Sequence, residues 1–174
     1  MADLPDRIVL KRDRDLGGRD IDLWARRVLM SLVAIVPVVA LFNVFGQRPS
    51  SHTLVGPAAS MKVVAPSHLR GGLLYEARFH VVARRELKDA TLVLGTGWLE
   101  GMTLNTIEPS PVSEASDNGR LSLELGHIPR GANYILFLQS QVNPTIVGRR
   151  TQTVELRDGE SSLLAFKRTV TIFP

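Results

Sequence analysis

The sequence contains no cysteine in its 174 residues. This absence excludes disulfides, thiolate nucleophiles, zinc sites with cysteine ligands and lipidation on cysteine. Lysine is also scarce, since the 21 basic residues are nearly all arginine. We interpret this bias as the mark of a GC-rich coding sequence. The C-terminal two thirds has no basic cluster interleaved with aromatic residues, so the pattern predicts no nucleic-acid partner.

Sequence motifs of catalysis are missing as well. There is no HExxH, no nucleophile elbow and no Walker loop, and no two of the four histidines are spaced as a metal pair. Gly95 and Gly97 precede a loop or strand, which is the wrong context for a dinucleotide fold. Glu114, Asp117 and Asn118 lack the spacing of a calcium loop. We therefore predict no cofactor, no metal and no enzymatic activity; a pair of carboxylates meeting as in a hydrolase is the less favoured alternative.

One long apolar run stands out near the N-terminus. Residues 28–46 carry no charge, and 19 helical residues span roughly the 30 Å hydrocarbon core of a bilayer. Pro37 lies in the middle, where lipid-embedded helices tolerate proline, and we expect a kink there. We predict a transmembrane helix over residues 24–46. Ser31, Pro37 and Asn43 are the candidate contacts with a partner's helices.

The charges that flank this run predict its orientation. Seven basic residues lie within residues 1–27, and Arg26 and Arg27 directly precede the apolar run. The positive-inside rule then places the tail, residues 1–23, in the cytoplasm and the C-terminal part outside the cytoplasmic membrane. The alternative is a cleaved signal peptide, including a twin-arginine signal. The apolar region of a signal peptide is shorter and is followed by a small-x-small site. Val38-Val39-Ala40 is small enough for such a site, but it lies inside the apolar run.

The rest of the chain divides by composition. Residues 47–60 are rich in proline, serine, glycine and alanine, which predicts a flexible linker. Residues 61–174 show strand signals and no helical period. Hydrophobic and polar residues alternate most clearly from Leu73 to Val81, which places the odd-numbered residues of this segment on one face of a strand. Turn signals such as Asp117-Asn118-Gly119 recur at short intervals.

This spacing predicts an all-β fold with seven or eight strands. We interpret it as an immunoglobulin-like β-sandwich attached to one N-terminal transmembrane helix, with a small barrel as the alternative. The last strand runs to the end of the sequence, so we expect its removal to unfold the domain.

Two segments are candidates for an interaction surface. Trp98, Leu99 and Met102 cluster beside glycines, where the tryptophan is either a core residue or an exposed anchor for a partner. The second segment is the pair Arg149 and Arg150, which would suit an acidic partner or a phosphate-bearing envelope polymer.

Three parts of the sequence carry a resemblance. The run IPRGANYILFLQSQVNPTIVGRR is similar to the later strands of bacterial immunoglobulin-like domains on envelope proteins. The combination of DLWARR, NVFGQRPS and GWLEGMTLNTIEPSP resembles an uncharacterised family of membrane-anchored proteins from high-GC Gram-positive bacteria. The resemblance covers nearly the whole chain from Asp22. It implies the architecture described above and a gene neighbour that is a multi-pass membrane protein, but no activity.

Together these patterns lead to a functional expectation. We expect a non-catalytic accessory or interaction subunit, anchored in the lipid bilayer, whose outer sandwich docks on a multi-pass membrane protein. The alternative is a module that binds envelope glycan or peptide.

Overall fold

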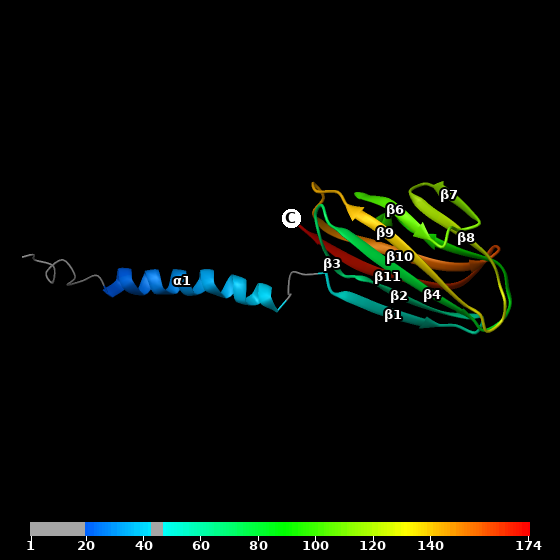
Figure 1. Cartoon of the computed structure of the whole chain (residues 1–174), viewed down its shortest axis with the longest axis horizontal. Helices are drawn as coiled ribbons and strands as arrows, with labels where there is room; N and C mark the ends of the chain where they lie inside the picture. Colours follow the sequence, from blue (N-terminus) through cyan, green and yellow to red (C-terminus); the bar gives the residue numbers. More distant parts are fainter. Residues whose placement is uncertain (1–19, 43–46) are drawn as a thin grey trace, which may run out of the picture. The chain divides into compact units, whose positions relative to one another are not determined.

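The computed structural model describes residues 20–42 and 47–174. They fall into two compact units, Met1–Val44 and Phe45–Pro174, which we describe separately. Figure 1 shows the helix of the first unit and the β-strands of the second.

The first unit contains helix α1, Asp20–Leu41. In the described residues it is the one helix that is long and apolar enough to cross a membrane, although a signal sequence would have the same properties. Side chains of residues 21–38 are all exposed. The helix begins four residues before the predicted boundary at Trp24, because nothing after Gly18 interrupts helical backbone. It continues through Pro37, whereas Asn43 and the predicted end at Gly46 lie outside the described residues.

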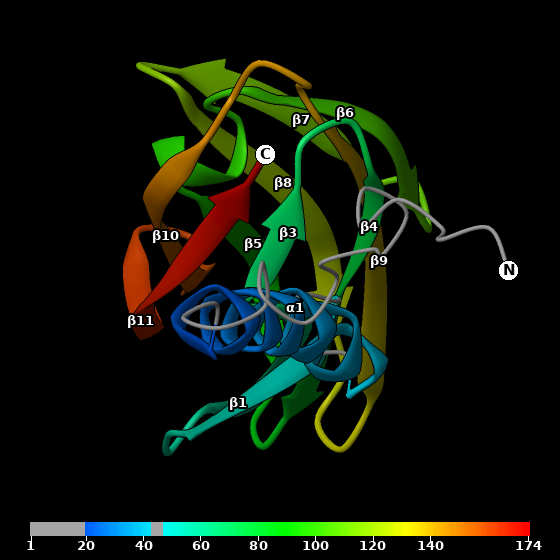
Figure 2. The same cartoon turned by 90° about the vertical axis from the view of Figure 1, so that its left-hand side faces the viewer.

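The second unit is a sandwich of two β-sheets. In the described residues the five-stranded sheet has the order β1 (Pro49–Val55), β2 (Ala59–Pro66), β4 (Leu74–Ala83), β9 (Asn133–Val142), β6 (Met102–Glu108). The six-stranded sheet has the order β3 (His68–Arg70), β11 (Ser161–Phe173), β10 (Gly148–Asp158), β5 (Leu87–Leu94), β8 (Arg120–Ile128), β7 (Ser113–Asp117). Figure 2 shows β10 and β11 on one side of the domain and β4 and β9 on the other.

The strand order confirms the immunoglobulin-like fold. Strands β2, β4, β9 and β6 reproduce the A-B-E-D sheet, and β5, β10 and β11 reproduce the C-F-G sheet, in the same chain order. Three additions extend this frame. Strand β1 lengthens the first sheet, β3 pairs in parallel with the end of β11, and the β7–β8 hairpin is added beside β5.

The predicted alternation is confirmed from Tyr75 to Val81, whereas Leu73, predicted on the same face, lies before β4 and is 47% exposed. Tyr75, Ala77, Phe79 and Val81 are buried between the sheets, while their neighbours along the strand are largely exposed. The predicted turn between β7 and β8 is confirmed too. Asn118 and Gly119 both have positive φ, the geometry of a two-residue hairpin turn.

The predicted flexible linker over residues 47–60 is wrong. Residues Pro49–Val55 form β1, which pairs with β2 along its whole length, and β2 itself begins at Ala59. Seven or eight predicted strands become eleven in the described residues, because β1, β3 and β7 were not expected. All three lie at sheet edges, where hydrogen bonds to one neighbour hold the strand. Most side chains of β1 and β7 are exposed, so these polar, serine-rich strands carry no period-2 signal. β3 has three residues, of which Leu69 is buried, and is too short to show a period.

Candidate functional site

The structure separates the two predicted interaction segments. Trp98 is 1% exposed and Met102 is 9% exposed, so both belong to the core, and Leu99 packs against it. The interpretation of Trp98 as an exposed anchor is therefore wrong. Arg149 is exposed, but Arg150 is half-buried, and its Nε lies 3.3 Å from the carboxylate of Glu100.

Two glycines explain why Trp98 lies inside. The short 3-10 helix Thr96–Trp98 crosses directly over β10. A Cβ at Gly97 would lie 2.1 Å from the carbonyl oxygen of Thr151, so this approach excludes any side chain. The amide of Gly95 and the indole Nε1 of Trp98 both donate to the carbonyl of Thr153, each at 3.0 Å. The glycines thus fix the loop on β10 and direct the indole into the core.

Polar groups lie beside this indole in the core. Burial raises the pKa of Tyr75 to about 12, so the phenol is neutral, and it donates to the sulfur of Met102 at 2.8 Å. Arg168 is 5% exposed, with its guanidinium carbon 5.8 Å from the ring of Trp98. Its Nη2 donates to the carbonyls of Ala65 and Pro66, while Nε and Nη1 have no hydrogen-bond partner among the residues that the structure describes. Desolvation lowers the pKa of Arg168, and no carboxylate compensates its charge within the described residues.

Replacing Arg168 by methionine tests whether the buried charge lowers the stability of the sandwich unit. We expect Arg168→Met to leave the free energy of unfolding of the sandwich unit unchanged or to raise it by about 1 kcal/mol, because desolvating an uncompensated charge costs more than two hydrogen bonds return. Arg168→Ala also removes the apolar stem and should cost about 2–3 kcal/mol. Urea unfolding measures both variants. A loss above 2 kcal/mol for the methionine variant would mean that the guanidinium is well solvated in the fold.

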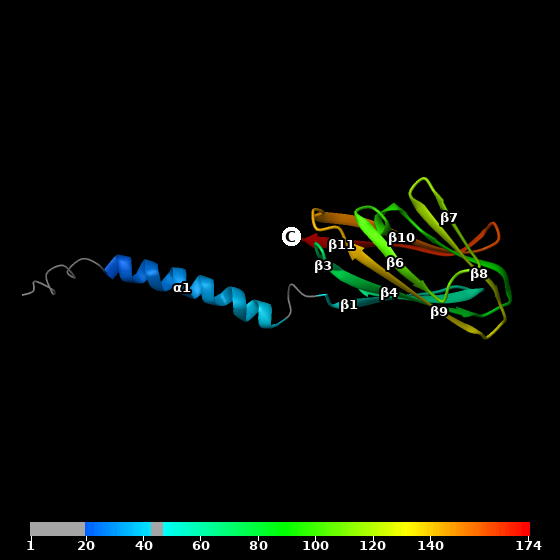
Figure 3. The ribbon, with the colours of Figure 1, turned by 45° about the horizontal axis from the view of Figure 1, so that its top comes forward.

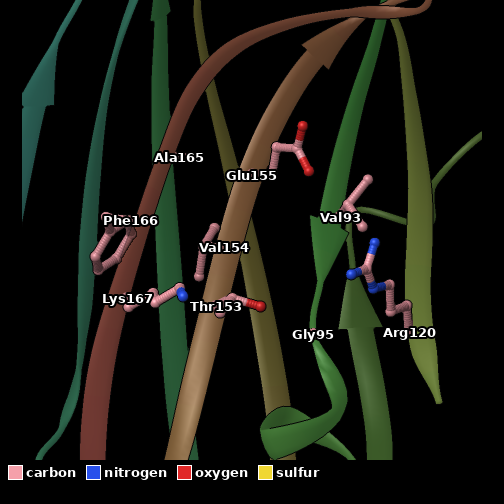
Figure 4. A pocket seen from close by; sticks show the side chains of 9 residues that line it. All are labelled: Val93, Gly95, Arg120, Thr153, Val154, Glu155, Ala165, Phe166 and Lys167. Carbon is pink, nitrogen blue, oxygen red and sulfur yellow. The ribbon is translucent and has the colours of Figure 1, made fainter.

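A shallow hollow lies on the outer face of the six-stranded sheet, among β5, β8, β10 and β11. Its volume is about 270 Å³. The hollow lies where Gly95 has no side chain, and a Cβ there would lie 2.0 Å from Oγ1 of Thr153. Figure 4 shows Arg120 and Lys167 on opposite sides of Thr153 and Gly95, with Glu155 on the same strand as Thr153. We call these five residues the sheet groove.

The charges of the sheet groove are unbalanced. Glu155 accepts two hydrogen bonds from Arg157, at 2.8 and 3.1 Å. This bond holds the pKa of the Glu155 carboxyl below its ordinary value, and the nearby charge of Arg120 lowers it further. Arg157 therefore neutralises the one carboxylate of the groove. Arg120 and Lys167 have no ion-pair partner among the residues that the structure describes, and together with the hydroxyl of Thr153 they suit an anionic group.

The sheet groove has the chemistry of binding. It contains no histidine, and its one carboxylate, that of Glu155, accepts two hydrogen bonds from Arg157. No group of three metal-ligating side chains occurs within residues 20–42 and 47–174. The four histidines lie elsewhere: His52 and His68 contact Phe166 and Phe173, His127 pairs with Glu86, and His80 lies on β4. Sequence reasoning missed Arg120 and Lys167, which β8 and β11 place on opposite sides of the same hollow.

Comparisons with known proteins identify no relatives by sequence. No protein-family model matches the chain, and no curated protein matches it. Solved structures with a similar arrangement include the CARDB domain of a Pyrococcus furiosus protein in complex with di-metal ions, with 15% identity, coverage of 70% of this chain and 98% of that one, and a TM-score of 0.40.

Two further structures give weaker matches. The GAE domain of GGA2p from Saccharomyces cerevisiae has 9% identity, 70% and 96% coverage and a TM-score of 0.37. The collagen-binding domain of a Staphylococcus aureus adhesin has 12% identity, 74% and 97% coverage and a TM-score of 0.33. All three scores lie below 0.5, so the ligands of these proteins have no bearing on this chain. The immunoglobulin-like assignment rests on the strand order above.

Proposed function

We propose that the chain is a non-catalytic, membrane-anchored interaction subunit. Helix α1 lies in the bilayer, Arg26 and Arg27 keep the N-terminal tail in the cytoplasm, and the sandwich docks outside on a multi-pass membrane protein. One observation carries the proposal: the sandwich completes its core without α1. Every buried hydrophobic residue among those described lies between Ala58 and Ile172. The apolar helix is thus not needed for the fold and is available to lipid and to a partner's helices.

The test is purification of the full chain from native membranes in a mild detergent. We expect a multi-pass protein to co-purify in stoichiometric amount. Ser31→Leu with Asn43→Leu removes the two polar side chains offered to a partner's helices and should reduce this recovery. Val36→Leu on the same span is the matched control and should not. A chain that elutes alone in its own detergent micelle contradicts the accessory role.

A second candidate function is suggested by the sheet groove. Its two uncompensated cations would bind a carboxylate or phosphate of an envelope glycan or peptide. We expect Lys167→Glu to weaken retention of the protein on cell-wall material by roughly tenfold or more, because it replaces an attraction by a repulsion.

Lys62→Glu provides the matched control for this experiment. Lys62 is an equally exposed lysine on the other sheet, so its reversal changes net charge by the same amount away from the groove. Equal losses for the two variants would indicate unspecific charge attraction and would remove the groove from consideration.

A further inference from the structure

One end of the sandwich carries exposed aliphatic side chains beside exposed arginines. The chain joins the domain at one end, where Nε2 of Gln47 donates to the carbonyl of Leu74 at 3.1 Å. Figures 1 and 3 show β3 and the C-terminus at this same end. We call Arg70, Leu73, Leu74, Val147 and Arg149 the tether surface.

Backbone contacts hold the tether surface together. The amide of Val142 donates to the carbonyl of Leu73 at 3.0 Å, which joins the β3–β4 turn to the end of β9. A Cβ at Gly71 would lie 2.9 Å from the carbonyl oxygen of Pro144, so this turn packs directly on the β9–β10 loop. Arg149 of β10 and Arg70 of β3 lie on either side of β11, opposite its residues Thr171 and Phe173. The surface is thus a continuous part of the domain.

Its apolar members are unusually open. Leu74 and Val147 are each 51% exposed and Leu73 is 47% exposed. Most other aliphatic side chains of the domain are buried. Three exposed aliphatic residues beside arginines form a small amphipathic surface of the kind that enters the interface of a bilayer.

The charge around these apolar residues is positive. Arg70 and Arg149 are exposed and have no carboxylate partner in the part of the chain that the structure describes. Glu76, which follows Leu74 by two residues, pairs with Arg78, and Glu100 pairs with Arg150, the neighbour of Arg149. The tether surface therefore offers uncompensated cations to an anionic neighbour.

The covalent connection limits where this surface can be. Gln47 belongs to the domain, so residues 42–46 alone connect it to Leu41, the last residue of α1. Extended backbone covers at most about 3.5 Å per residue, which gives a reach of roughly 20 Å. If α1 spans a bilayer, the tether surface cannot leave the neighbourhood of its headgroups.

We propose that the tether surface docks on the anionic lipid surface around α1. This inference rests on the proposed anchoring by α1. Leu73, Leu74 and Val147 enter the interfacial layer, while Arg70 and Arg149 bind lipid phosphates. Docking fixes the direction of the sandwich relative to the membrane, and the sheet groove remains accessible on the side of the domain.

The test uses the full chain in lipid nanodiscs of phosphatidylcholine with and without phosphatidylglycerol. The absence of native cysteine allows one fluorophore to be placed at Val147→Cys. The control is Val55→Cys, a second exposed valine, which lies at the far end of β1. The strand extends about 20 Å from Pro49 to this residue, at about 3.4 Å per residue. Nitroxide on the lipid headgroups should quench the probe at position 147 and leave the probe at position 55 bright.

Two further arms make the outcome decisive. Arg70→Gln with Arg149→Gln should lower the ratio of docked to undocked domain by roughly 25-fold in the anionic discs, at about fivefold per arginine. Leu32→Cys, probed by nitroxide deep in the acyl chains, reports on α1 itself. If the probe at position 32 is quenched while the probes at positions 147 and 55 give equal signals, the docking proposal is overturned. The proposed anchoring by α1 then still stands. No quenching at position 32 overturns the anchor and the proposed function with it.

Discussion

Deleting residues 169–174 is expected to leave the sandwich unit unfolded. The deletion removes Val170 and Ile172, whose side chains are 0% and 2% exposed, and each contributes about 1.5–3 kcal/mol by burial. It also removes Thr171–Phe173, the partner segment of β3, and part of the ladder with β10. A domain of this size has about 5–15 kcal/mol of stability in total. The two side chains remove about 3–6 kcal/mol of it. The lost ladder hydrogen bonds and the core residues exposed by the deletion add to this loss, which brings it to the size of the margin.

Circular dichroism and limited proteolysis of the truncated sandwich unit measure this effect. Removal of Pro174 alone is the control, since that residue is exposed and outside β11. A truncated chain that still unfolds cooperatively, with a midpoint close to that of the control, would show that β11 is dispensable and that the strand order described here is wrong.

Replacing Trp98 by alanine is expected to lower the free energy of unfolding by about 3–5 kcal/mol. The indole is fully enclosed, with its ring 5.4 Å from the ring of Phe79, and its Nε1 bonds the carbonyl of Thr153. Trp98→Phe keeps most of the apolar volume and should lose less, including about 1 kcal/mol for the hydrogen bond.

Urea unfolding of the sandwich unit gives these values directly. Val112→Ala is a suitable control, because Val112 is 71% exposed and its truncation should change stability by less than about 0.5 kcal/mol. A loss below 1 kcal/mol for Trp98→Ala would contradict the position of the indole between the sheets. It would favour the alternative that Trp98 is an exposed anchor for a partner.

How far the sequence predicts this fold depends on where a strand lies. β4 is buried on one face, so hydrophobic and polar residues alternate and the strand is readable from Leu74 to Ala83. The same holds for Leu121, Leu123 and Leu125 of β8, which are buried. Strand β1 lies at an edge, its residues are mostly exposed, and its serines and threonine resemble a linker. Backbone pairing, which composition does not encode, makes it a strand.

The candidate sites were less predictable for a related reason. A tryptophan between glycines has the same sequence context whether its ring points inward or outward, and the contact of Gly97 with Thr151 decides between the two. Arg120 and Lys167 are far apart in sequence and line the same hollow only because β8 and β11 belong to one sheet. Arg149 was recognisable as an exposed cation, but its position at the tether end required the fold.

The central claim is that α1 holds the chain in the membrane with the sandwich outside. A single cysteine at Val112→Cys, compared with one placed in residues 1–19, tests it by labelling intact cells with a membrane-impermeant maleimide. We predict that the cysteine at position 112 reacts in whole cells, that the tail cysteine reacts only after lysis, and that both labelled chains stay in the membrane pellet at full length. Labelling of the tail in whole cells, or release of a shortened chain from the membrane, would contradict the account.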